Sequence, residues 1–154
     1  MSTATDLAKA IRDVYLNGRW IAQTNYQQEL AQVTLAQAVQ KTGELNTIAT
    51  LTFHIDYYLD GLLSVMAGGP LQIRDALSYM FTLPQDEAEW MAMKALLFQH
   101  AESFAAQVEG MSEAQLQDAF VDIRYGTWKR NIEAVIEHGY YHLGQIVLLR
   151  KMQM

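Results

Sequence analysis

Residues 137–151, "EHGYYHLGQIVLLRK", hold two of the chain's four histidines, four positions apart in an otherwise largely apolar stretch. Side chains four apart on an α-helix are separated by about 400° of rotation and roughly 6 Å of rise, so His138 and His142 share one face. Two adjacent seven-residue repeats run through them: Trp128, Val135, His142 and Leu149, and Asn131, His138, Gln145 and Met152. The stretch therefore predicts a long core-facing helix, expected over residues 125–152, with both histidines on or beside its buried stripe.

Two imidazoles on one helix face can converge on a metal ion, because zinc lies about 2.0–2.1 Å from each ligating nitrogen. A third histidine, His54, lies beside the apolar stripe of a second helical stretch, "NTIATLTFHIDYYLDGLL" at residues 46–63. If that helix faces the last one, His54, His138 and His142 form a three-imidazole set with a coordination position left for water or substrate. Such a set suits a divalent ion such as zinc, nickel, iron or copper, and we expect zinc.

The competing interpretation treats these histidines as ordinary core residues whose ring nitrogens find hydrogen-bond partners. A single histidine on an apolar helix face is more often of this kind than a metal ligand, and the HxxxH spacing alone is a weak signal. The fourth histidine, His100 in "LLFQHAESF", borders the apolar face of another expected helix. For His100 we expect a structural role.

Long helices account for most of the chain. Apolar periodicity and capping residues predict four of them, over residues 4–17, from an N-cap at Asn46 to Met66, from Pro84 to Val108, and over residues 125–152. Shorter helical pieces are expected in three places: in residues 26–42 after N-caps at Asn25 and Thr34, around residues 72–80, and after a capping box of Ser112 and Gln115. We therefore expect one all-α domain spanning residues 1–154, a four-helix bundle whose long connection at residues 70–83 leaves the second and third helices parallel.

Composition narrows the function classes. The formal charge of −6 argues against a general phosphate-binding surface, so we expect no nucleic-acid partner. The chain has no cysteine, which excludes disulfides, thiolate metal sites and a cysteine nucleophile. The N-terminus lacks the pattern of a signal peptide and no run of 18 uncharged apolar residues occurs, so we expect a cytoplasmic protein with no membrane partner.

Two segments together resemble the DinB-like superfamily, and in particular its small uncharacterised members. They are "FHIDYYLDGLL" at residues 53–63 and "NIEAVIEHGYYHLGQIVLLRK" at residues 131–151, and the pattern extends over nearly the whole chain. The resemblance implies an up-down-down-up four-helix bundle that holds a divalent metal through His54, His138 and His142. It also implies a homodimer. Some members are thiol S-transferases that use low-molecular-weight thiols such as bacillithiol or mycothiol, and others are isomerases or hydrolases.

Two hypotheses of function follow. In the first, the protein is an enzyme whose metal lowers the pKa of a thiol or water, and the resulting nucleophile attacks a small electrophilic molecule. Gln145 is then a hydrogen-bonding residue near the site, Asp56 and Asp60 are candidates for supporting or general-base roles, and Glu137 points away. Five aromatic residues are candidates for shaping the pocket: Tyr57, Tyr58, Trp128, Tyr140 and Tyr141. In the second hypothesis the protein is a non-catalytic metal-binding or interaction module.

Overall fold

The computed structural model describes residues 3–154, and within them the fold is all-helical, as the sequence predicts. Four helices are long: α1 (Ala4–Tyr15), α4 (Ile48–Met66), α5 (Glu87–Glu109) and α7 (Trp128–Met152). Short elements lie between them: α2 (Tyr26–Leu30), α3 (Leu35–Val39), the 3₁₀ helix η1 (Asp75–Tyr79), α6 (Glu113–Gln117) and the 3₁₀ helix η2 (Ile123–Tyr125). No strand forms in residues 3–154; Ala119 and Thr127 make one isolated bridge. Across the same residues, each helix is too short or too polar to cross a membrane.

Short polar side chains set where the helices begin. Asn25 and Thr34 cap α2 and α3, and Ser112 with Gln115 forms the predicted capping box of α6. Three predicted helix starts are wrong, and α1 ends at Tyr15 instead of at residue 17. The N-cap of α4 is Thr47 and not Asn46, because the Thr47 hydroxyl reaches the Thr50 amide. Helix α5 begins at Glu87 behind the N-cap Asp86, so Pro84 lies before the helix. Helix α7 begins at Trp128 behind Thr127, and the expected start at residue 125 belongs to η2.

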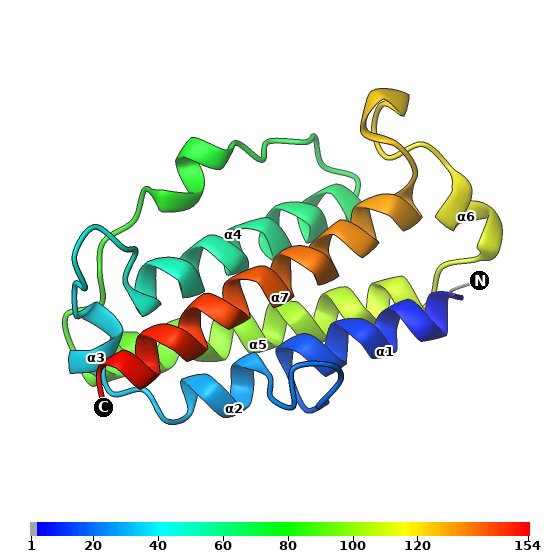
Figure 1. The fold of residues 1–154 in the computed structure, drawn as a ribbon. Helices are drawn as coiled ribbons and strands as arrows, with labels where there is room; N and C mark the ends of the chain where they lie inside the picture. Colours follow the sequence, from blue (N-terminus) through cyan, green and yellow to red (C-terminus); the bar gives the residue numbers. More distant parts are fainter. Residues whose placement is uncertain (1–2) are drawn as a thin grey trace.

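The long helices pack around one apolar core. Helix α4 contacts α5 and α7, and α1 contacts the same two helices from the other side. In Figure 1, α4 and α5 both run from left to right, whereas α1 and α7 run from right to left. The predicted apolar stripes of α4 and α5 face this core. Met66 and Met93 in these stripes are half-buried, and the other members are buried: Ile48, Leu51, Ile55, Leu59 and Leu62 on α4, and Trp90, Leu97, Ala101, Phe104 and Val108 on α5. The neighbouring positions of His54 on α4 and of His138 and His142 on α7 follow from this packing.

The crossover between α4 and α5 lies against the outer face of α4. Figure 1 shows the whole segment, with η1 in its middle, running along that helix. Gly61 allows the close approach, because a Cβ there would come within 2.4 Å of the Ile73 side chain. The segment is therefore held next to the α4 face that carries His54.

Two buried tyrosines hold α7 at a fixed register. The Tyr15 hydroxyl donates to the Val135 carbonyl at 3.0 Å, and the Tyr26 hydroxyl donates to the Gly139 carbonyl at 2.7 Å. The two rings stack with centroids 5.2 Å apart. A Cβ on Gly139 would lie 2.6 Å from the Tyr15 hydroxyl oxygen, so this position requires glycine. Because the two carbonyls flank His138 in sequence, the tyrosines fix the height of this part of α7 relative to α1 and α2.

Candidate metal centre

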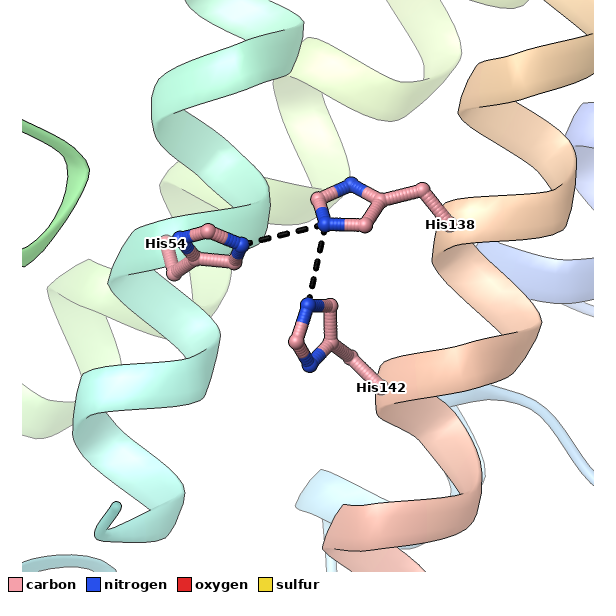
Figure 2. Close-up of side chains that lie close together, drawn as sticks. All are labelled: His54, His138 and His142. Carbon is pink, nitrogen blue, oxygen red and sulfur yellow. Dashed lines mark hydrogen bonds between the residues drawn. The ribbon is translucent and has the colours of Figure 1, made fainter. Parts of the chain in front are cut away.

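The structure brings the three predicted histidines together. His54 projects from α4, and His138 and His142 project from α7 across the space between the helices (Figure 2). The Nε2 atom of His138 lies 3.0 Å from that of His54 and 2.9 Å from that of His142. One ligand atom from each of the three lies within 4.8 Å of the others, close enough to hold one metal ion. His54 and His142 are only 2% and 6% exposed, and His138 is half-buried.

A hydrogen-bond chain determines the tautomer of His54. Its Nδ1 lies 2.7 Å from the hydroxyl oxygen of the buried Ser78 in η1. That hydroxyl donates its only proton to the Asp75 carbonyl at 2.5 Å. Ser78 therefore accepts from the Nδ1–H of His54. The network thus assigns a free lone pair to Nε2, the nitrogen that faces the other two histidines.

His142 is oriented in the same way by its own helix. Its Nδ1 lies 2.6 Å from the side-chain oxygen of Gln145, one turn further along α7. An amide oxygen only accepts, so Nδ1 carries the proton and Nε2 presents a lone pair. Gln145 was expected to form hydrogen bonds near the site, and its partner in the structure is the imidazole of His142. Partners of this kind fix the ring orientation of a metal-ligating histidine and raise its basicity.

Two lone pairs then point at the Nε2 of His138. A single N–H on that nitrogen can satisfy one of them and leaves the other unpaired. A divalent cation between the rings accepts the Nε2 lone pairs of all three histidines at once. Tetrahedral zinc with nitrogen ligands at about 2.0–2.1 Å would hold those nitrogens roughly 3.3 Å apart. The observed separations of 2.9 and 3.0 Å are within a few tenths of an ångström of that value, so the donor set fits such an ion.

The electrostatics of the cluster keep the imidazoles neutral. Burial, together with the neighbouring histidines, lowers the pKa of His54 to about 4 and that of His138 to about 4. Burial also lowers the pKa of His142, against an opposing effect of its hydrogen bond to Gln145. A histidine must be neutral to bind a metal, and at pH 7 all three are.

Aromatic rings enclose the cluster. Tyr79 of η1 stacks on His54 with ring centroids 4.5 Å apart, and Tyr141 meets His142 edge-on at 4.8 Å. Tyr58 lies edge-on to both His54 and His138, at 5.2 and 5.1 Å, and its hydroxyl donates to the Asp75 carboxylate at 2.7 Å. The segment η1 thus contacts the cluster through Ser78 and Tyr79, and Asp75 accepts hydrogen bonds from Ser78 and Tyr58, two of the residues next to it.

The remaining acidic and histidine candidates lie away from the cluster. His100 pairs with the buried Asp56 at 2.7 Å, so its structural role is supported and Asp56 supports no metal ligand. Asp60 is exposed. Glu137 is exposed and paired with Arg130 at 3.1 Å, consistent with its predicted orientation.

Among the five aromatic candidates, Tyr58 and Tyr141 contact the histidines. The other three make contacts elsewhere: the Tyr57 hydroxyl accepts from the Arg74 amide, Tyr140 donates to the Trp20 carbonyl, and Trp128 packs edge-on against Phe120. Sequence reasoning missed Ser78, Tyr79 and Asp75 altogether. Their only signal was the short helix expected around residues 72–80, because nothing in the sequence shows that this segment folds back over His54.

We compared the chain with protein-family models, with curated proteins and with solved structures. No family model matches it, and neither of the other two comparisons yields a match. The functional assignment therefore rests on the geometry of the three histidines and their surroundings.

Proposed function

We propose that His54, His138 and His142 bind one divalent ion, zinc in the first instance, and that the protein is a metal-dependent enzyme acting on small electrophilic molecules. The observation that carries the proposal is the convergence of three neutral imidazoles on one point, two of them oriented by Ser78 and Gln145. Oriented neutral imidazoles with no further acidic ligand are typical of sites that leave a coordination position for a reactant.

A divalent ion held there would supply Lewis acidity and lower the pKa of a thiol or water that binds to it. The chain's own residues supply the rest. Ser78 and Gln145 hold the proton on the outer nitrogen of two imidazoles, so the inner nitrogens stay free. Tyr58, Tyr79 and Tyr141 shield the cluster from bulk water. The reaction class that matches is group transfer to a thiol or hydrolysis.

The resemblance to the DinB-like superfamily supports the same proposal. It places the metal ligands on the second and fourth long helices of an up-down-down-up bundle, and it suggests a low-molecular-weight thiol as co-substrate. We also propose a homodimer, from the same resemblance, and a cytoplasmic location, because the chain has no cysteine.

A non-catalytic metal site is the second candidate. The observation in its favour is the burial of His54 and His142, since a closed structural ion also stabilises a helical core. The two candidates differ in whether the ion can take an added ligand.

The test uses the untagged protein loaded with Co²⁺, whose visible spectrum reports the number and type of its ligands. We expect one ion per chain and a spectral change on adding azide or a small thiol. Stoichiometric Co²⁺ with a spectrum that neither addition changes would favour the structural site. Failure to bind Co²⁺ or Zn²⁺ would refute both.

A further inference from the structure

A pocket of about 410 Å³ adjoins the histidine cluster. Its walls come from α4, from the crossover, from the loop before α7 and from α7 itself, where His138 forms part of the lining. Tyr58 belongs to both features, because it lines the pocket and its ring lies edge-on to His54 and His138. The pocket and the candidate metal centre therefore share a wall.

The lining carries no formal charge. None of its ten residues is Lys, Arg, Asp or Glu, and most are aliphatic or aromatic, including Leu62, Ile73 and Phe120. In the metal-free protein, a carboxylate or phosphate entering these surroundings would lose hydration without gaining a cationic partner from the lining, which is unfavourable. The volume falls within the range of small-molecule sites, which are mostly apolar with a few placed polar groups.

Two of the four polar side chains in the lining, Tyr58 and Asn131, already donate their protons to other groups. The Tyr58 hydroxyl proton is committed to the Asp75 carboxylate at 2.7 Å. The Asn131 amide nitrogen donates to the Tyr125 and Thr127 carbonyls, each at 2.8 Å. Each amide proton is therefore in use, and Asn131 has only its oxygen to offer a ligand. A ligand meets hydrogen-bond acceptors at these two residues, whereas the Tyr125 hydroxyl and the His138 ring are left to donate to it.

We propose that this pocket binds uncharged, mainly apolar small molecules and delivers them to the His138 side of the cluster. As a substrate site the pocket rests on the proposed function; as a binding site it stands without the metal. While no ion is bound at the cluster, the lining disfavours acidic molecules, including thiols that carry carboxylates. An uncharged aromatic or aliphatic electrophile is the class that it accepts.

The test uses N-phenyl-1-naphthylamine, a neutral probe whose fluorescence rises in apolar surroundings. We expect saturable binding at one site per chain. The anionic analogue 8-anilinonaphthalene-1-sulfonate should bind at least about tenfold more weakly, because its sulfonate finds no partner. This comparison uses the wild-type protein without bound metal.

A matched pair of variants locates the probe. Ala134→Phe fills the pocket from α7 and should abolish saturable binding. Ala106→Phe adds the same ring on α5, in a different pocket that Trp128 lines, and should leave binding unchanged. Equal affinity in both variants, or tighter binding of the sulfonate, would overturn the inference.

Two further measurements separate the pocket from the metal. The His54→Ala variant should still bind the neutral probe, whether or not it has lost its ion. In the Co²⁺-loaded protein, 4-phenylimidazole should change the visible spectrum, and Ala134→Phe should prevent this with its Co²⁺ content unaltered. Probe binding without any metal binding would refute the proposed function alone. Metal binding without probe binding would refute the pocket alone.

Discussion

Ser78→Ala provides a sensitive test of how the candidate site is built, because Ser78 touches no metal itself. Its hydroxyl is fully buried and lies 2.7 Å from the Nδ1 of His54. Removing it leaves the Nδ1–H without an acceptor and allows the proton to move to Nε2. The variant should therefore weaken metal binding while keeping all three histidines.

The expected magnitude follows from this single contact. Losing the hydrogen-bond partner of a metal-ligating histidine typically costs about 10–100-fold in metal affinity. That range corresponds to roughly 1.4–2.7 kcal/mol, which matches the cost of about 1–3 kcal/mol for leaving a buried polar group unpaired. We expect the Zn²⁺ dissociation constant of Ser78→Ala to rise within this range.

The assay is competition for Zn²⁺ against a chromophoric chelator, with circular dichroism to confirm that the variant is folded. Ser103→Ala is the control, because Ser103 is an exposed serine on α5 that lines a different pocket. Ser78→Thr keeps the hydroxyl and should retain more affinity than the alanine variant. A folded Ser78→Ala protein with wild-type affinity would show that the tautomer argument is wrong.

Four other outcomes are expected. Gln145→Glu places a carboxylate on the imidazole that it orients and should tighten Zn²⁺ binding; weaker binding in the chelator assay would contradict this. Tyr26→Phe removes a buried hydrogen bond to α7 and should lower the free energy of unfolding by about 1–3 kcal/mol in urea titrations. A change near zero would contradict the role of Tyr26 in holding α7. In metal-free protein the pKa values of His54 and His138 are lowered to about 4, whereas unfolded histidine titrates near about 6.5. Between these two pH values the unfolded chain binds more protons than the folded one. Folding stability that is present above pH 6.5 is therefore lost as the pH falls toward 4. A melting temperature that stays constant from pH 7 to pH 5 would contradict this. Sedimentation at micromolar concentration should give a dimer, and a species of 17.5 kDa would refute it.

Local signals in the sequence predicted most of the fold. The apolar stripes placed the four long helices, and short polar residues such as Asn25, Thr34 and Ser112 marked where three short helices begin. One error, at the start of α4, occurred where two neighbouring residues could cap the same helix. Asn46 and Thr47 are both good N-caps, and the choice depends on which side chain reaches the amide of Thr50.

The candidate site was predicted only in part. The HxxxH spacing and the single histidine on the α4 stripe pointed to His54, His138 and His142, because helical periodicity fixes which face a side chain occupies. The contacts of Ser78 and Tyr79 depend on where the crossover lies, and periodicity does not determine the path of a long connection. The same holds for the pocket, whose walls come from four separate parts of the chain.

The most direct test of the central claim is the metal content of four single variants, His54→Ala, His100→Ala, His138→Ala and His142→Ala. Each is purified without an affinity tag and analysed by elemental mass spectrometry. We expect about one divalent ion per chain in the wild type and in His100→Ala, because His100 is paired with Asp56 away from the cluster. The other three variants should lose most of it, since two imidazoles hold an ion far less well than three. Stoichiometric metal in His54→Ala would make His54 a core residue, and the three-histidine site would be wrong.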